Sequence, residues 1–397
     1  MPEIELSVMI HTPQTVEVLT GLLKEFTAQT GIHVNLNTLQ WASAHVELNR
    51  TALYHHGPDV SEIGSTWVND LIAMNSLRPF AQNEINQIGR PEEFVAEAWN
   101  SGRLQGDPTQ WAIPWLAETY LIHYRQDVLQ KAGIDPATAF TSHEQLAQTV
   151  QRLVENGVDV PIELPLGLDR FGSLHVLASW IWTAGGDFCE PDGRHVAFNQ
   201  PRALAALHAY FDILRSLPAE TRKKIRERER GLFERGRSAI SFGTLMFYAN
   251  HQNAPQETKD NWRVTPLPGD HFIGGSNLVV WKHTRNDRAA IELVRYLTSP
   301  AVQVRVAPAL AAMPPRLAAL DLPAIANDPV LNVFGQSIRT GRTYPSIPLW
   351  GLIEDRLIAA LVQIGEAALT DDATDLDQLI KQYLDPLARK LNITLAQ

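Results

Sequence analysis

The chain has a single cysteine, Cys189, among 397 residues. An intramolecular disulfide is therefore impossible, and a metal site built from cysteines is excluded as well. No run of 18 or more apolar residues occurs, so no transmembrane helix is predicted. Positive charge is also scarce, because 34 lysines and arginines face 44 acidic residues and the formal net charge is −10. That balance argues against a nucleic-acid partner, which favours a basic protein surface.

Residues 222–230 (RKKIRERER) form the one basic stretch, and Glu227 and Glu229 interrupt it, which is typical of a solvated helix face. Catalytic signatures are missing too: there is no HExxH, phosphate-binding loop, GxSxG or GxGxxG motif. His55-His56 has no second ligand pair at metal spacing, which favours a surface position. We therefore predict no catalytic residue, no metal and no cofactor. The 44 acids guarantee some close carboxylate pairs by chance, so a glycosidase stays open.

What the chain does have is length for two domains and a regular alternation of strands and helices at its start. Residues 4–10, 32–39 and 60–64 are predicted strands. The helices between them are predicted at residues 15–31 and 42–54. The first of these has an apolar face and ends at the capping glycine Gly31; the face is formed by Val16, Leu19, Leu22, Leu23 and Phe26. This order predicts an α/β fold with a mostly parallel sheet.

Two later stretches share one build. Residues 111–133 contain Pro114-Trp115, a short strand at 120–124, then a helix that Gly133 ends. Residues 272–302 contain a Gly-Gly turn, a buried strand and an amphipathic helix stopped at Ser299-Pro300. These patterns, in this order, resemble the hinge segments of the ABC-transporter extracellular solute-binding proteins of family 1, the carbohydrate-binding, maltose-binding-protein-like group. Weaker matches to the same family run along essentially the whole chain.

The resemblance implies a two-lobe periplasmic-binding fold of class II, each lobe a mixed, mostly parallel sheet flanked by helices. It implies lobe one at residues 1–115 plus 272–314 and lobe two at 116–271 plus 315–397. The implied function is capture of a sugar in the interlobe cleft by hinge closure, followed by delivery to the permease of an ABC importer. A monomer outside the cytoplasm is implied, periplasmic or extracellular and membrane-associated. Residues 1–10 do not form a signal peptide, so a signal or lipoprotein leader is expected to have been removed.

Ten tryptophans are many for this length, and six lie beside the ends of predicted strands, where ligands sit in open α/β sheets. An indole face can cover the C–H face of a pyranose, while nearby amides and carboxylates bind its hydroxyls. Packing in the core or in a lid is the equally weighted alternative. These six candidates are Trp41, Trp67, Trp115, Trp180, Trp182 and Trp350.

Polar candidates follow the same strand ends, and each has a structural alternative. Ser65 and Thr66 suit sugar hydroxyls but are also common helix caps. Glu118 resembles an acid that relatives point at sugar hydroxyls, or it forms a hinge salt bridge. Gly275, with Ser276 and Asn277 after it, either lets the backbone approach a ligand or supplies a turn with positive φ.

Phe242, Tyr344 and Arg316 complete the candidate set. Phe242 ends a predicted strand of lobe two, and Tyr344 precedes Trp350 in a loop where relatives stack sugar on an aromatic ring. Arg316 matches a recurrent hinge arginine, with structural ion pairing as the alternative. Other functions stay open: a non-sugar solute (a polyol phosphate, phosphodiester, metal chelate or polyamine), a carbohydrate-active enzyme, or a sensor lobe that partners a receptor.

Overall fold

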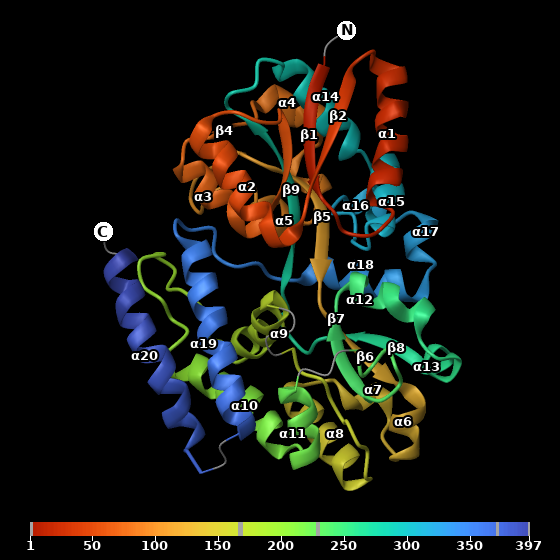
Figure 1. Cartoon of the computed structure of the whole chain (residues 1–397), viewed down its shortest axis with the longest axis vertical. Coiled ribbons are helices and arrows are strands. Elements are labelled where there is room, and N and C mark those ends of the chain that lie inside the picture. The colour runs from red at the N-terminus through yellow and green to blue at the C-terminus, as the bar shows by residue number, and fades with distance from the viewer. Residues whose placement is uncertain (1–2, 166–169, 228–230, 371–372, 396–397) are drawn as a thin grey trace. The chain divides into compact units, whose positions relative to one another are not determined.

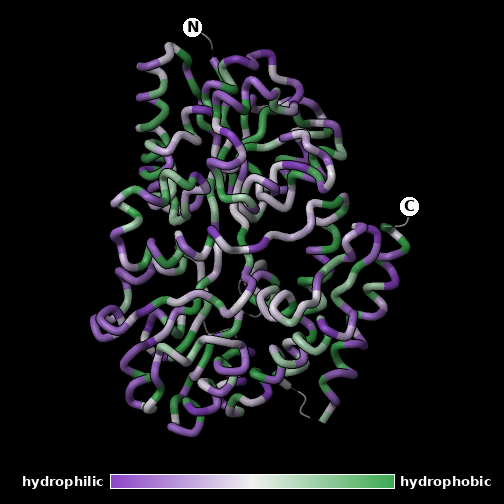
Figure 2. Tube along the Cα trace, turned by 180° about the vertical axis from the view of Figure 1, so that it is seen from behind, coloured by the Kyte–Doolittle hydropathy of each residue, from purple (hydrophilic) through white to green (hydrophobic). Residues whose placement is uncertain are grey.

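The computed structural model describes residues 3–165, 170–227, 231–370 and 373–395. The chain forms two compact units, and it passes between them three times. The first unit contains Met1–Thr119 and Ile273–Gly351, and the second contains Tyr120–Phe272 and Leu352–Gln397. No helix of the described residues is both long and apolar enough to cross a membrane. Figure 2 colours the chain by hydropathy, and much of the outer trace of each unit is hydrophilic.

The first unit is built on a mixed sheet. Its strands follow the order β2-β1-β3-β9-β4, and β5 also pairs with β9. β1 pairs in parallel with β2 and β3, whereas β9, teal among the red and orange strands of Figure 1, is antiparallel to its neighbours. The strands are β1 (Glu3–Met9), β2 (His33–Leu39), β3 (Val60–Gly64), β4 (Leu77–Arg78), β5 (Ile113–Thr119) and β9 (Ile273–Trp281). The expected β-α-β-α-β start is confirmed.

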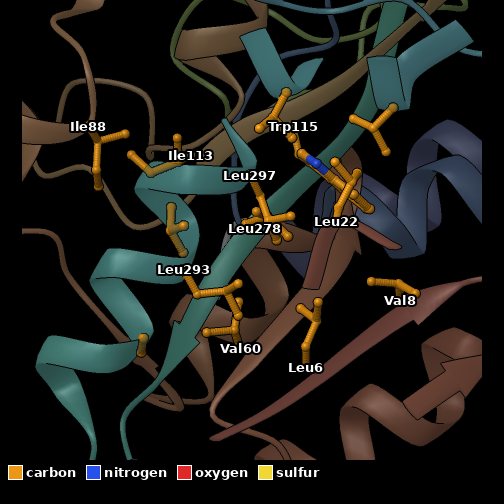
Figure 3. Close-up of a cluster of buried hydrophobic side chains, with 14 of the residues drawn as sticks. Leu6, Val8, Leu22, Val60, Ile88, Ile113, Trp115, Leu278, Leu293 and Leu297 are labelled. Carbon is orange, nitrogen blue, oxygen red and sulfur yellow. The ribbon is translucent and has the colours of Figure 1, made fainter. Parts of the chain in front are cut away.

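Helices cover both faces of this sheet because its central strands are apolar on both sides. On β9, Leu278 and Val280 pack into one core cluster, while Val279 and Trp281 pack into another on the opposite face. Figure 3 shows the first of these clusters, in which Leu278 lies among side chains from β1, β3, β5 and the helices.

The helices of the first unit are short apart from α1, α2 and three later ones. They are α1 (Thr15–Thr30), α2 (Trp41–Tyr54), η1 (Ser65–Trp67), α3 (Val68–Ala73), α4 (Gln82–Ile88), η2 (Pro91–Glu93), α5 (Ala96–Asn100), α14 (Asp287–Leu297), α15 (Pro300–Ala309), α16 (Leu317–Leu320), α17 (Pro323–Ala326) and α18 (Pro329–Thr340). α1 buries the predicted apolar face and ends at Gly31, which has φ 72°. Val16 is the exception, because it is 46% exposed.

Residues 315–351, expected in the second lobe, group with the first unit. The backbone of Met313 exchanges two hydrogen bonds with that of Ala117, at 2.7 and 2.9 Å. Arg316 then places its guanidinium in the first unit, where it donates to the carbonyls of Ile88 and Thr298 and pairs with Glu93 at 2.9 Å. These bonds fix the start of the segment before α16 begins.

The second unit has a three-stranded sheet in the order β7-β6-β8. Its strands are β6 (Leu121–Arg125), β7 (Ile240–Gly243) and β8 (Trp262–Pro266). Both pairings are antiparallel, whereas a mostly parallel sheet was expected. Alternating strands and helices predict parallel pairing, but the same apolar pattern suits either direction once long helical connections separate the strands.

Helices make up most of the rest of the second unit. They are α6 (Gln126–Lys131), α7 (Pro136–Ala139), α8 (His143–Glu155), α9 (Arg170–Thr183), α10 (Pro201–Ser216), α11 (Ala219–Arg226), α12 (Leu245–Ala249), η3 (Asn250–Asn253), α13 (Gln256–Asn261) and α20 (Leu376–Leu395), together with α19 (Trp350–Thr370), which begins in the first unit. Ser142 is a common capping residue and predicts a cap for α8 from the sequence. The structure has this cap, since the Ser142 hydroxyl accepts the N–H of Gln145 at 3.1 Å.

Candidate functional site

Aromatic rings gather where the parallel strands of the first unit end. Trp41 opens α2 directly after β2, and Trp67 closes η1 after β3. The two indoles meet edge to face with centroids 5.9 Å apart, and His11, which follows β1, meets Trp41 in the same way at 5.3 Å. Trp67 is buried and stacks on His45 at 4.9 Å, whereas Trp41 is 37% exposed. Trp41 is therefore the predicted residue here whose ring is open to a solute.

One of these rings, that of His11, pairs with a buried carboxylate. His11 Nε2 is 2.7 Å from Glu62 Oε1, and the other oxygen of Glu62 accepts the backbone N–H of Met9 at 2.8 Å. Burial lowers the pKa of His11, but the charge and hydrogen bond of Glu62, with a further contribution from Glu118, outweigh it and leave that pKa raised. Sequence reasoning missed both residues, since a lone histidine after a strand and a carboxylate within one carry no motif.

We expect Glu62→Gln to lower the pKa of His11 below its ordinary value of 6.5, because burial then acts against the protonated ring with less opposition. NMR titration of the imidazole measures this directly. In the unmodified protein, the raised pKa of His11 means that protonation of its ring stabilises the fold, and this contribution is fully present below the pKa that His11 has in the unfolded state. That contribution is lost as pH rises through the folded-state pKa. A pKa of His11 that stays above 6.5 in the variant would contradict the assignment.

Ser65, which follows β3, and the candidates at the start of β9 lie close together inside the first unit. Ser65 begins η1 and lines a small enclosed hollow with Gly275, Ser276 and Asn277. No side-chain hydrogen bond caps η1 or α3, so the capping alternative for Ser65 and Thr66 is not what the structure shows. Both are half-buried.

The start of β9 has a packing requirement of its own. Gly275 has φ +130°, and a Cβ there would lie 2.1 Å from the carbonyl oxygen of Leu116. Ser276 and Asn277 are buried, and the Asn277 amide donates to the Ser101 hydroxyl at 3.0 Å. The positive-φ alternative is thus present here, and ligand contact by these three residues stays a prediction.

Trp115 and Arg316 serve the packing of the first unit. Trp115 is fully buried in the cluster of Figure 3. Arg316 is buried with its guanidinium 4.5 Å from the centroid of the Phe94 ring, in addition to its pairing with Glu93. The ion-pairing alternative therefore accounts for Arg316, and neither residue has a surface open to a solute. Glu118 is half-buried at the end of β5 and stays a candidate.

The remaining aromatic candidates are all buried. Tyr344 and Trp350 stack on each other with centroids 4.6 Å apart. In the second unit, Trp180 stacks on His143 at 4.0 Å. Trp182 instead donates its indole N–H to Asp187 at 3.2 Å. Packing covers nearly all of the surface of each of these four side chains. Their contact with solute stays a prediction.

The second unit has a hollow of about 550 Å³ at the end of β7. Of the predicted residues only Phe242 lines it. Sequence reasoning missed the others, because they come from a loop, a strand start and a short helix; among them are Tyr120, Glu163, Glu234, Met246 and Phe247. Burial, followed by the charge of Glu234, raises the pKa of Glu163 to about 7.

Comparison with known proteins decides the family. The family model described as bacterial extracellular solute-binding protein matches residues 12–304. The chain belongs to this family. The resemblance found in the sequence is therefore confirmed, and the protein is a solute-binding protein of a family that acts outside the cytoplasm.

Three curated relatives of this solute-binding protein are similar at low identity. The diacetylchitobiose-binding protein DasA of Streptomyces coelicolor is 23% identical over 345 residues, which cover 84% of this chain and 78% of the relative. The maltotriose-binding protein of Pyrococcus abyssi is 20% identical over 347 residues, 84% and 71% of the two chains. A probable ABC transporter-binding protein of Deinococcus radiodurans is 27% identical over 204 residues, about half of each chain (49% and 48%).

Solved structures show the fold. The sugar-binding protein MalE of Xanthomonas citri superposes with a TM-score of 0.83 at 22% identity, over 99% of this chain and 98% of its own. The GacH receptor of Streptomyces glaucescens gives 0.78 at 19% identity, over 98% of both chains. The predicted fold class, that of the two-lobe periplasmic binding proteins, is thereby confirmed.

Proposed function

We propose that this solute-binding protein captures a carbohydrate outside the cytoplasm and delivers it to the membrane permease of an ABC importer. Family membership supports solute capture, and the relatives named for diacetylchitobiose and maltotriose support a carbohydrate. One observation carries the proposal: the half-open indole of Trp41 stands at the carboxyl ends of parallel strands, in edge contact with His11 and Trp67. An apolar ring beside polar groups suits the two kinds of surface that a sugar presents.

The candidate residues of the first unit offer a solute both an apolar ring and polar groups. Trp41 covers a C–H face, while the hydroxyls of Ser65 and Thr66 and the carboxylate of Glu118 pair with sugar hydroxyls. A bond to a carboxylate is about twice as strong as one between neutral groups, so Glu118 orients the solute. Hinge closure and the monomeric state, both implied by the resemblance, stay predictions, and a lipid anchor stays one of the two alternatives for the leader.

We propose a binding role rather than catalysis, because the relatives are named for binding. Among the residues that the structure describes, no three His, Cys, Asp or Glu side chains gather as a metal site. Turnover of aryl-glycosides that is abolished by changing one acid would contradict this part of the proposal.

A thermal-shift panel tests the function. Mono-, di- and oligosaccharides are compared with polyols, amino acids, polyamines and phosphodiesters. A ligand that binds only the folded protein increases its unfolding free energy, by about 2.7 kcal/mol at a hundredfold excess of ligand over Kd. The unfolding midpoint rises accordingly. We expect a shift with a subset of the saccharides. A flat saccharide series beside a polyamine or phosphodiester shift would keep the family and overturn the carbohydrate.

A further inference from the structure

The hollow of the second unit combines apolar walls with two acidic side chains. Its described lining is largely apolar, with Tyr120, Phe242, Met246 and Phe247 among its walls. Two carboxylates, Glu163 and Glu234, are the charged groups on that described lining, which holds no lysine or arginine. A hollow with aromatic walls and acid at one side is complementary to a group that is apolar on its faces and cationic at one point.

Glu163 is held rigidly at this wall. Its backbone N–H donates to the carbonyl of Ile240 in β7 at 2.8 Å. Its carboxylate accepts the backbone N–H groups of Leu232 and Phe233, at 3.3 and 2.8 Å. Phe233 is itself fully buried, with its ring centroid 4.8 Å from that of Trp262. The position of this carboxylate is therefore set by the backbone before any ligand arrives.

Both carboxylate oxygens of Glu163 accept a hydrogen bond, whereas one oxygen of Glu234 does not. Its Oε2 is buried and has no hydrogen-bond partner among the atoms that the structure describes. A buried carboxylate oxygen without a donor costs free energy, and so does a second negative charge near the first. A positively charged donor placed between the two acids removes both penalties.

We propose that the solute carries an amino group, and that Glu163 and Glu234 bind its positively charged nitrogen in this hollow. This rests on the proposed function and narrows it from carbohydrates in general to amino sugars. The ammonium donates to the carboxylate of Glu234, whose buried Oε2 turns toward the hollow to meet it, and to the remaining lone pairs of Glu163, while the Tyr120, Met246 and Phe247 side chains cover the apolar faces of the sugar ring.

The proposal has a pH signature. Among the residues that the structure describes, four titratable or charged groups bear on the site: Glu163, Glu234, Tyr120 on the lining, and the exposed Arg235, whose charge opposes the raised pKa of Glu163. A bound ammonium favours ionised Glu163, so binding releases a proton and the affinity rises as pH approaches the pKa of about 7 from below. A neutral saccharide gains nothing from this ionisation.

Calorimetric titration with three β-1,4-linked disaccharides tests it: the di-glucosamine, its di-N-acetylated form and the diglucose. Between about pH 5.5 and about pH 7, we expect the di-glucosamine to bind at least about tenfold more tightly than the other two, a difference of about 1.4 kcal/mol. Its advantage should grow with pH. Glu234→Gln, which keeps size and loses charge, should abolish the advantage, and Glu163→Gln should abolish the pH trend. Glu155→Gln, on the exposed end of α8, should change neither.

The failures are distinguishable. Equal binding of the three disaccharides, or tighter binding of the acetylated form, overturns the amino-group proposal and leaves carbohydrate capture intact. If none of the saccharides in the panel binds, the proposed function fails. If a polyamine or Ca²⁺ alone binds and Glu234→Gln abolishes that binding, the hollow takes cations but the amino-sugar proposal is overturned.

Discussion

Trp115→Ala is expected to lower the unfolding free energy of the first unit by about 3–5 kcal/mol. The indole is fully buried in the core cluster formed by the sheet and the helices around it, so its removal exposes no new surface and leaves a cavity. For a unit of this size the loss corresponds to roughly 10 °C in the midpoint of thermal unfolding. Denaturant and thermal unfolding measure it.

The same variant separates packing from binding. We expect Trp115→Ala to keep its solute affinity per folded molecule, measured below the lowered midpoint, because no part of the ring is exposed. If the variant unfolds like the unmodified protein and loses affinity instead, Trp115 contacts solute and the described packing of the first unit is wrong.

Trp41→Ala is expected to do the opposite. It should weaken binding of the carbohydrate that the panel identifies by about 2 kcal/mol, the loss typical of a tryptophan at the centre of a contact. That is roughly a thirtyfold rise in Kd. Because Trp41 is 37% exposed and begins α2 rather than filling a core, its removal should cost little stability. Calorimetric titration gives the affinity, and the unfolding midpoint gives the stability.

The matched control is Tyr54→Ala at the other end of the same helix. Tyr54 is 77% exposed and lies where α2 ends rather than where the strands end. It should change neither affinity nor midpoint. Equal effects of Trp41→Ala and Tyr54→Ala on solute affinity, or no effect of Trp41→Ala, would show that Trp41 and the rings around it are not part of the binding site.

Local pattern was enough to predict the parts that depend on one face of one element. α1, its glycine cap and the Ser142 cap of α8 follow from apolar spacing and capping chemistry, and the structure has them. Trp41 was predicted to lie just after a strand, and it begins α2 after β2, while its contact with solute stays a prediction. Val16 was wrongly included in the buried face of α1: it is 46% exposed, and its neighbour Thr15 is the buried residue of the first turn.

What depends on distant partners could not be predicted. Arg316 is buried because Ile88, Thr298 and Glu93 converge on it from other parts of the chain. The apolar residues of β6, β7 and β8 suit either strand direction, so they did not predict that these strands pair antiparallel. His11 and Glu62 meet only because parallel strands end at one edge of the sheet, and no motif marks either residue.

Calorimetric titration of the unmodified protein and of Trp41→Ala, with the saccharide that gives the largest thermal shift, tests the central claim most directly. Carbohydrate capture predicts a saturable 1:1 heat for the unmodified protein and a Kd roughly thirtyfold higher for the variant. A saccharide heat identical in both proteins would contradict the placement of the site. No heat with any saccharide, beside saturable binding of a polyamine or phosphodiester, would contradict the carbohydrate itself.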